Sequence, residues 1–342
     1  MTQTRSTLTP RHAPADDAPS IELWYGPEIY IGQRGRSNRW VNVLGRVHAP
    51  VGLHDLRWQL LDRTEYLAGP LNVGPTAYRL VDPGDFNLEL DPALLHEGPN
   101  RLRIEAVDRH GQTDEAEVVV HLCPEPKCEL PFQVDFGSLE RIDEAAHVVD
   151  GCWSLGPDGV RTRQIGYDRM LTVGSREWTD YEVLTSFTVH GYSDTPLLEE
   201  LPNCGTLVSV ILRWQGHVNW HDLVPYRGYR PFGIMAMHGH RFNQTSRYAL
   251  YKNDDRMYPP EAPHHELEPG RRQWLRVSVQ SRENQTSWYR MKAWADGHDE
   301  PDAWTFEEPG PDDELKAGSV VLMAHQTDVT FHGLEVRAVA PR

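Results

Sequence analysis

Short stretches in which apolar and polar residues alternate recur along almost the whole chain. Clear examples are WVNVLGRV (40–47), RLRIEAVD (101–108), LVSVILRW (207–214), WYRMKAW (288–294) and SVVLMAH (319–325). Gly, Pro, Asp and Asn separate these stretches, and little of the chain has apolar residues at helical spacing. Alternation with a period of two is typical of half-buried β-strands. The pattern therefore predicts an all-β protein.

The proline-rich segment CPEPKCELPF (123–132) interrupts this pattern and marks a boundary. With 342 residues, the chain is long enough for two domains that each bury a core. We therefore expect a disordered tail at 1–19, a first β domain at 20–122, a Pro-rich linker at 123–131 and a second β domain at 132–342. The composition of the tail, rich in Thr, Pro, Ala and Asp, is typical of disorder.

The end of the first domain, residues 94–122, contains EGPN (97–100), AVD (106–108) and Gly111. These resemble the Gly–Asn turn, the Ala-x-Asp strand end and the second turn in the terminal hairpin of bacterial immunoglobulin-like domains. The segment 40–60 is similar to the first two strands of such a domain. The resemblance implies an Ig-like β-sandwich, a fold that mostly spaces or supports other modules.

The second domain contains a W-x-x-x-x-x-G strand at Trp153 and Gly159, WTDYEV at 178–183, RWQ at 213–215 and an Asp-Gly turn at 296–297. In these features it resembles the laminin-G-like bacterial branch of the concanavalin A-like lectin/glucanase superfamily. The resemblance covers essentially the whole domain and implies a β-jelly roll. Because this superfamily contains sugar-binding modules, glycoside hydrolases, polysaccharide lyases and adhesion domains, it leaves the function open.

Alternation also predicts which side chains of WYRMKAW share a face of their strand. Tyr289, Met291 and Ala293 form one face, which has the character of a core. The other face carries two indoles and two cations, namely Trp288, Arg290, Lys292 and Trp294. Indoles stack on the C–H faces of sugar rings, while Arg and Lys bind hydroxyls or carboxylates. We expect these four residues to bind a ligand; the alternative is a loop-covered face with snorkelling cations.

The strand that ends in LRWQGH is expected to border the same groove. Arg213 and Gln215 alternate with the apolar residues of this strand, so they are predicted to bind the ligand if their face is the concave one. His217, His221 and Asp222 follow at the strand end. The histidines thus border the predicted groove, and their chemistry stays open at this point.

Histidines and tyrosines near this groove also suit an enzyme. We take His217, His238, His240 and Tyr251 as candidate catalytic residues, and Tyr248 stands close to them in RYALY. Jelly-roll lyases use an Arg or Gln to neutralise a uronate, a His or Tyr as base and a Tyr as acid. The E-x-D-x-x-E motif of related glucanases is absent from the sequence, which counts against a retaining glucanase.

A metal site is a further hypothesis for the histidines. His238 and His240, joined by His217 or His221 and by Asp222, have the residue types that a transition metal requires, although hydrogen-bonded loop histidines are the simpler interpretation. Calcium is a candidate cofactor, because many members of the resembled superfamily bind it with loop carboxylates and carbonyls. No cofactor is certain.

The four cysteines give a weaker signal. Cys123 and Cys128 either close a short disulfide or supply half of a zinc site. Cys152 and Cys204 form no second C-x-x-C pair, so ordinary free or paired cysteines are favoured over zinc.

Charge and hydropathy exclude several partners. The net charge of −16 opposes binding to phosphate backbones, and basic residues form no run, so we expect no nucleic acid partner. No apolar stretch approaches the roughly 20 residues that span a bilayer, so we expect no membrane insertion. The first residues lack the apolar region of a secretory signal, which predicts a cytoplasmic protein, or a secreted one if the sequence is truncated.

Taken together, these features predict a lectin-like, carbohydrate-binding protein that takes a poly- or oligosaccharide on the concave face of a jelly roll. The alternative is a polysaccharide lyase or glycoside hydrolase on the same fold, with His, Tyr and Arg as acid–base groups.

Overall fold

The computed structural model describes residues 17–341 except 62, 77–78, 125–127, 194–204, 218–229, 243–244, 253–256, 260–261, 284–285 and 311–314. The described chain is built from β-strands, which confirms the predicted all-β class. Its helical elements are three short 3-10 turns, η1 (Pro92–Leu94), η2 (Phe136–Ser138) and η3 (Ile142–Glu144). No helix among the described residues is long and apolar enough to cross a membrane.

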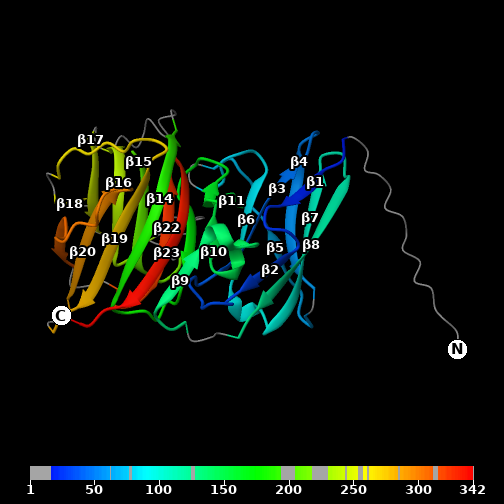
Figure 1. Ribbon diagram of the computed structural model, residues 1–342. Coiled ribbons are helices and arrows are strands. Elements are labelled where there is room, and N and C mark those ends of the chain that lie inside the picture. The colour runs from blue at the N-terminus through cyan, green and yellow to red at the C-terminus, as the bar shows by residue number, and fades with distance from the viewer. Residues whose placement is uncertain are drawn as a thin grey trace.

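The first eight strands form two sheets, which we call the first unit (Figure 1). One sheet has the strand order β1-β3-β6 and the other β2-β8-β7-β4-β5. The strands are β1 (Ser20–Leu23), β2 (Glu28–Ile31), β3 (Val41–His48), β4 (Leu53–Leu60), β5 (Leu67–Pro70), β6 (Asp85–Leu90), β7 (Gly98–Asp108) and β8 (Thr113–Leu122). Strand β2 pairs parallel with β8, whereas the other pairings are antiparallel. Apolar side chains of both sheets, such as Val43, Phe86 and Ile104, form one core.

The remaining strands form the second unit, which lies beside the first (Figure 1). A seven-stranded sheet has the order β10-β13-β22-β15-β16-β17-β18, and an eight-stranded sheet has the order β11-β12-β23-β14-β19-β20-β21, with β9 paired to β23. The strands are β9 (Phe132–Asp135), β10 (His147–Asp150), β11 (Trp153–Gly156), β12 (Gly159–Thr162), β13 (Arg169–Val173), β14 (Tyr181–Tyr192), β15 (Thr206–Trp214), β16 (Ile234–Phe242), β17 (Thr245–Tyr251), β18 (Met257–Tyr258), β19 (Arg272–Ser281), β20 (Ser287–Ala295), β21 (Phe306–Pro309), β22 (Ser319–His325) and β23 (Thr327–Ala338).

The two sheets of the second unit enclose a large core that includes Val210, Phe187 and Leu322. Tyr289 and Met291 belong to this core and are fully buried, which confirms the predicted inward face of β20. The seven-stranded sheet is apolar on its other face as well, where Met237 and Met323 pack together. The eight-stranded sheet instead carries polar and aromatic side chains on the face turned away from the core, which we call the outer face.

A break in alternation changes the face on which Trp214 lies. The sequence pattern places Trp214 with Val208, Val210 and Leu212, but Trp214 packs with the apolar cluster on the opposite side of the seven-stranded sheet. Arg213 has φ of 53°, and the register between β15 and β22 shifts between Ile211 and Trp214. Because an irregular residue breaks the period of two, the residues after it change faces.

Candidate functional site

Two indoles stand side by side on the outer face. Trp274 of β19 lies directly opposite Trp294 of β20, and both side chains are partly exposed. Their ring planes are parallel to within 10°, and their centroids are 6.3 Å apart. Nε1 of Trp274 donates a hydrogen bond of 2.9 Å to Oδ1 of Asp296, which fixes the ring against the turn after β20.

A groove of about 830 Å³ adjoins this indole pair, and Asp296 lines it. We call it the outer groove; its polar lining includes Asp158, Arg161, Thr188, Arg272, Asp296 and His332. These residues come from β12, β14, β19, β23 and two turns, so the eight-stranded sheet positions most of them. Thr188 lies opposite Arg272 in the pairing of β14 with β19, on the same face as the indoles.

Hydrogen bonds of His332 link two other residues of the groove lining and fix the tautomer of its ring. Its Nδ1 lies 2.5 Å from the backbone carbonyl oxygen of Asp158, and its Nε2 lies 2.8 Å from Oγ1 of Thr188. A carbonyl oxygen only accepts, so Nδ1 carries the proton and Nε2 accepts from the threonine hydroxyl. Burial lowers the pKa of His332, and the nearby Arg272 acts in the same direction, so the ring is neutral near pH 7.

The four residues of β20 that were predicted to bind a ligand have different surroundings in the structure. Trp294 is partly exposed beside Trp274, but Lys292 is only 8% exposed, and its Nζ lies 2.7 Å from Oε1 of Glu300. The ring of Trp304 covers the guanidinium of Arg290 and the Lys292 ammonium at 4.6 and 5.2 Å. Because the segment after β20 folds back over Arg290 and Lys292, these contacts agree with the alternative of a loop-covered face and do not support a role of the two cations in ligand binding.

Trp288 lies at the other end of the same strand. Its Nε1 donates a hydrogen bond of 2.9 Å to Oε2 of Glu307, and Arg282 lies over its ring at 5.1 Å. The pairing register places Trp288 opposite Gln280, far along the strand from the Trp274–Trp294 pair. Trp288 is therefore separate from the outer groove.

Arg213 and Gln215, also predicted to bind the ligand, instead contact other parts of the protein. Arg213 is fully buried, and its guanidinium donates to the carbonyl oxygen of Thr179 at 2.9 Å and to Oγ of Ser287 at 2.5 Å. Nε2 of Gln215 donates to the carbonyl oxygens of residues 176 and 317. Both side chains thus stabilise loops at the end of the sandwich, which follows from the break in alternation at Arg213.

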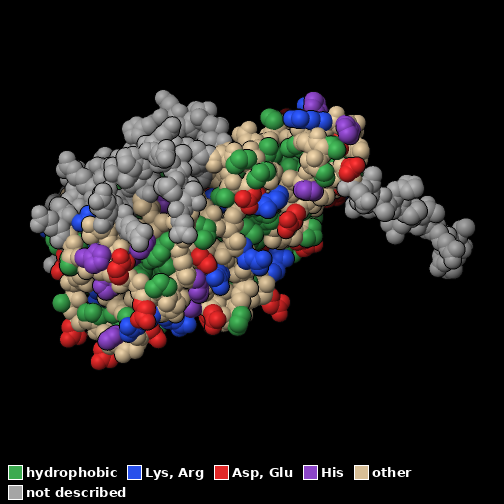
Figure 2. Space-filling view, turned by 90° about the horizontal axis from the view of Figure 1, so that it is seen from above, with side chains coloured by type: hydrophobic (Ala, Val, Ile, Leu, Met, Phe, Trp, Pro, Cys, Tyr) green, Lys and Arg blue, Asp and Glu red, His purple; other side chains and the backbone are tan. Residues whose placement is uncertain are grey.

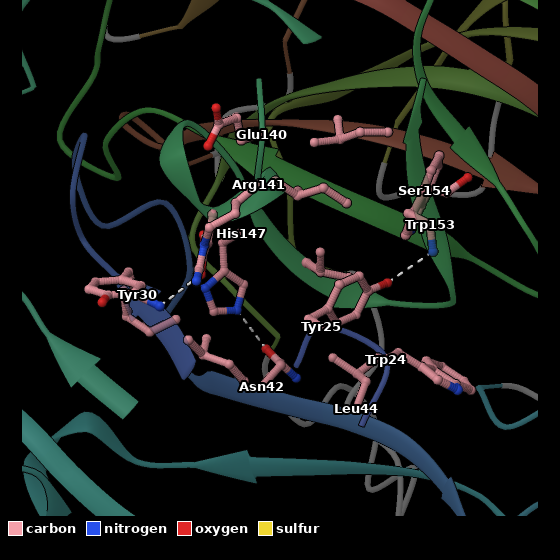
Figure 3. A pocket seen from close by; sticks show the side chains of 16 residues that line it. Trp24, Tyr25, Tyr30, Asn42, Leu44, Glu140, Arg141, His147, Trp153 and Ser154 are labelled. Atoms are coloured by element: carbon pink, nitrogen blue, oxygen red, sulfur yellow. Dashed lines mark hydrogen bonds and ion pairs between the residues drawn. The ribbon is translucent and has the colours of Figure 1, made fainter. Parts of the chain in front are cut away.

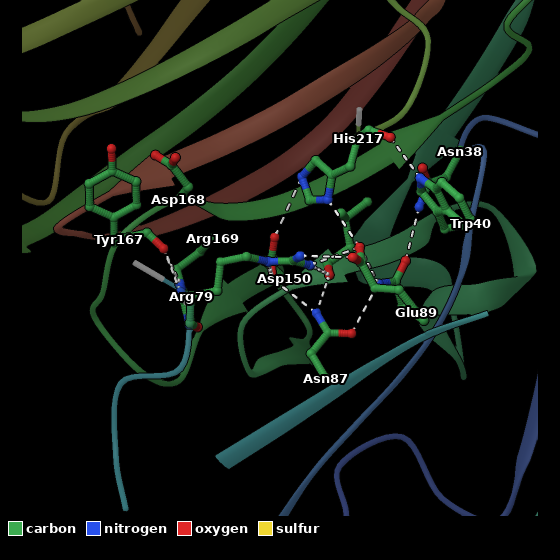
Figure 4. Close-up of polar contacts among 12 residues, drawn as sticks. Asn38, Trp40, Arg79, Asn87, Glu89, Asp150, Tyr167, Asp168, Arg169 and His217 are labelled. Atoms are coloured by element: carbon green, nitrogen blue, oxygen red, sulfur yellow. Dashed lines mark hydrogen bonds and ion pairs between the residues drawn. The ribbon is translucent and has the colours of Figure 1, made fainter. Parts of the chain in front are cut away.

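His217 lies in a buried cluster between the two units (Figure 4). Its Nδ1 is 3.1 Å from Oε1 of Glu89, and its Nε2 is 3.7 Å from Oδ2 of Asp150. Arg79 forms ion pairs with both carboxylates, at 3.1 Å with Glu89 and 2.7 Å with Asp150. Asn87 donates to Asp150 at 2.9 Å. We call these five residues the inter-unit cluster.

The inter-unit cluster balances its own charges. Burial opposes ionisation of Glu89, but Arg79 and His217 outweigh it and hold the pKa of Glu89 well below its ordinary value. Burial raises the pKa of Asp150, and Arg79 opposes that rise. Because each charged group faces opposite charges inside the cluster, these contacts account for His217 as part of the packing between the two units, and they do not support its predicted catalytic role.

His238 and His240 lie together on the inward face of β16. His238 is 1% exposed, and its Nε2 donates a hydrogen bond of 2.8 Å to the carbonyl oxygen of His265. Burial lowers the pKa of His238 to about 4. Nδ1 of His240 lies 3.1 Å from Oε2 of Glu266, and its ring stacks on Tyr192 with centroids 3.9 Å apart.

The two tyrosines considered for catalysis lie on opposite sides of the seven-stranded sheet. The Tyr248 ring meets His238 edge-on at 4.9 Å. Tyr251 instead packs against the apolar cluster on the opposite side of the sheet, and its hydroxyl accepts a hydrogen bond of 2.7 Å from Arg230. The structure therefore joins His238 and His240 with Tyr248, but with neither His217 nor Tyr251.

A second cavity of about 420 Å³ lies between the two units (Figure 3). The hydroxyl of Tyr25 donates to the carbonyl oxygen of Gly151 at 2.7 Å and accepts from the backbone N–H of Trp153 at 2.9 Å. Nε2 of His147 lies 2.9 Å from Oδ1 of Asn42. These polar groups bond to one another across the cavity, which is characteristic of an interface.

The structure describes the possible metal ligands and the cysteines in part. Within the described ranges, no group of three or more His, Cys, Asp or Glu side chains is arranged to hold a metal ion. Cys123, Cys128 and Cys152 are free, so the disulfide alternative for the first two is wrong. His221, Asp222 and Cys204 lie outside the described residues.

Most residues of the outer groove and one of the two adjoining indoles were not predicted from the sequence. They are Arg272, Thr188 and His332 of the groove and Trp274 of the indole pair. A usable signal was present in RRQWLRVSVQ, where Arg272 and Trp274 alternate with the buried Gln273 and with core residues. That signal was not enough to identify the site, because only the pairing of β19 with β20 places Trp274 beside Trp294.

Comparisons with known proteins give no family assignment. No protein-family model and no curated protein match the chain. Among solved structures, the chain is similar to the VIP36 exoplasmic/lumenal domain in its Ca²⁺/Man2-bound form, with 11% identity, 60% of this chain and 87% of that chain covered, and a TM-score of 0.37.

Two further likenesses cover more of the chain. A carbohydrate-binding module of the β-sandwich superfamily has 8% identity, coverage of 96% of this chain and 99% of its own, and a TM-score of 0.21. The Bacteroides ovatus protein SGBP-B, in complex with a mixed-linkage heptasaccharide, has 11% identity, coverage of 95% and 100%, and a TM-score of 0.21. With identities and TM-scores this low, these likenesses carry no weight for function.

Proposed function

We propose that this chain is a carbohydrate-binding protein that takes saccharides on the outer face of its eight-stranded sheet. The observation that carries the proposal is the parallel Trp274–Trp294 pair, open in part to solvent and adjoining the outer groove. Partly exposed parallel indoles offer the apolar surface on which the C–H faces of sugar rings stack. The groove adds hydroxyl, carboxylate and guanidinium groups that bind sugar hydroxyls.

The finer architecture belongs to the same proposal. We assign residues 20–122 to an Ig-like sandwich that supports the binding module, and 132–342 to a concanavalin A-like jelly roll. Support comes from the separate core of the first eight strands and from the two stacked sheets that enclose the larger core. In this arrangement the saccharide binds on the sheet that does not contain His238.

Catalysis on a bound saccharide is a second candidate function. Nδ1 of His238 and the hydroxyls of Tyr192 and Tyr248 are buried, with no hydrogen-bond partner among the described residues. Polar atoms of this kind call for a water, a ligand or a chemical role. A neutral imidazole nitrogen and nearby phenols are the base and acid types of a polysaccharide lyase.

The first experiment combines binding and product detection on a panel of polysaccharides. We expect at least one polymer to bind, and we expect a Trp274→Ala/Trp294→Ala double variant to bind it about tenfold or more weakly, because aromatic anchors dominate such contacts. Trp288→Ala is the matched control, since it removes an indole from the same strand outside the groove. Unchanged binding by the double variant would overturn the proposed surface.

Product detection separates the second candidate from the first. Release of reducing or unsaturated ends by the wild type, lost in His238→Phe with binding retained, would establish catalysis at the histidines. Binding of a panel member without any product would exclude that candidate for the polymer tested. The folded state of each variant is checked by its urea unfolding midpoint.

A further inference from the structure

Arg272 differs from the other arginines of the outer groove because no carboxylate of the described residues pairs with it. We propose that the saccharide taken by this protein is acidic, and that Arg272 binds its carboxylate or sulfate group. This inference rests on the proposed function and names the ligand class of the same site. The Arg272 side chain is partly exposed and lines the groove.

The nearest polar neighbour of Arg272 accepts nothing from it. A guanidinium nitrogen of Arg272 lies 3.2 Å from Nδ1 of His332. Nδ1 carries a proton that it donates to the carbonyl oxygen of Asp158 at 2.5 Å, so the two nitrogens are both donors and form no hydrogen bond. Within the described ranges, no carboxylate lies within 4.0 Å of the Arg272 guanidinium. Its donors therefore remain available to a ligand.

Neighbouring arginines show that a guanidinium without a carboxylate partner is unusual on this sheet. Arg161, also in the groove, forms a two-point ion pair with Asp328 at 2.9 and 2.7 Å. Arg276, four residues after Arg272, pairs with Glu300 at 2.6 Å and with Glu182 at 2.6 Å. With 50 acidic against 34 basic residues, the chain has carboxylates in excess. Among the described residues Arg272 has no acidic partner, even though carboxylates are abundant in the chain.

The position of Arg272 fits an acidic group carried by a stacked sugar. Arg272 and Trp274 lie on one face of β19, two residues apart, which separates them by about 7 Å along the strand. A pyranose ring on the indole would place a ring substituent at that distance. The planar guanidinium makes two parallel hydrogen bonds to a carboxylate or a sulfate, which favours an acidic substituent over a neutral one.

The net charge of −16 does not contradict a local site of this kind. Figure 2 shows acidic and basic side chains interspersed over the described part of one face, without a large area of one charge. Because exposed charges farther apart than the Debye length are screened at physiological salt, a contact ion pair depends mainly on its immediate surroundings. Arg161 and Arg271 stand nearby, each already facing a carboxylate of the protein.

The test compares polymers that share a backbone and differ in charge. Dextran is compared with carboxymethyl-dextran and dextran sulfate, and polygalacturonate with its methyl ester, by calorimetry on the whole chain. We expect an acidic member to bind about tenfold or more tightly than its neutral partner, and Arg272→Gln to remove this preference, with a loss of acidic binding much larger than any loss of neutral binding. The two dextran derivatives distinguish a carboxylate from a sulfate.

Arg282→Gln is the matched control, because Arg282 is an exposed arginine at the other end of the sheet, over Trp288. Arg272→Lys is expected to retain part of the preference, since it keeps the charge but loses the planar fork. Equal binding of acidic and neutral members, or a preference that survives Arg272→Gln, overturns the inference and leaves the proposed function standing. Failure of every polymer to bind, neutral ones included, overturns the proposed function itself.

Discussion

The inter-unit cluster and the outer groove are built from the same kinds of side chain and do opposite things with them. Each contains an arginine and a histidine beside acidic residues, and each has tryptophans nearby. In the cluster, Arg79 faces two carboxylates and His217 lies between the same two. In the groove, Arg272 has no carboxylate within ion-pairing distance in the described chain. Residue type alone therefore separates a structural cluster from the proposed binding site poorly.

The difference follows from burial. Arg79 is 9% exposed on its side chain, so leaving its charge unpaired there would cost several kcal/mol, and the fold supplies two carboxylates. The partly exposed Arg272 keeps contact with water and can stay unmatched at little cost. A protein can therefore hold an unmatched charge for a ligand only at a place that water still reaches.

The largest expected effect tests the inter-unit cluster. We expect Arg79→Met to lower the free energy of unfolding by about 3–5 kcal/mol, because Asp150 and Glu89 are left buried without their cation. Arg161→Met, which removes an exposed ion pair in the outer groove, is expected to cost about 1 kcal/mol or less. Urea unfolding monitored by tryptophan fluorescence measures both. Equal losses in the two variants would contradict the distinction.

The pH dependence of stability sharpens the comparison through His147, beside the inter-unit cluster. Burial lowers its pKa from 6.5 to about 4. Between these values the unfolded chain holds a proton that the folded chain lacks, so the free energy of unfolding rises with pH across this window and falls on acidification. From pH 7 to pH 5 the loss amounts to about 2 kcal/mol.

His147→Gln removes this contribution, because an amide can still donate to Asn42 but does not titrate. We expect the pH 7 to pH 5 difference in unfolding free energy to shrink by about 2 kcal/mol in this variant. His332→Gln in the outer groove is the comparison; its pKa is also lowered by burial, but the side chain is partly exposed, so a smaller change is expected. An unchanged pH profile in His147→Gln would contradict the account.

The smallest expected effect concerns Arg272 itself. Since it makes no ion pair in the described chain, Arg272→Gln is expected to change the free energy of unfolding by no more than about 0.5 kcal/mol. The thermal midpoint of the ligand-free protein measures this. A loss as large as that of Arg79→Met would show that Arg272 stabilises the fold and would remove the reason to assign it to a ligand.

Local sequence patterns predicted much of the fold, but they predicted less of the candidate site. Alternation predicted the β class and placed Tyr289 and Met291 in the core, because a strand has no other way to divide its side chains between two faces. The same rule identified Trp294 on the outward face. It failed after Arg213, where a residue with positive φ interrupts the period. For Arg290 and Lys292 it left ligand binding and a loop-covered face as alternatives, and it could not show that Trp304 covers them.

By itself the sequence determined the strand class, the inward faces of regular strands and the acidic balance of the chain, since these depend on neighbours two residues apart or on composition. Only the tertiary structure decided which polar residues meet. His217 contacts Glu89, which is 128 positions away in the sequence, and Trp274 lies beside Trp294 because β19 pairs with β20. Such contacts are set by sheet order and by the packing of the two units, and neither leaves a periodic trace in the chain.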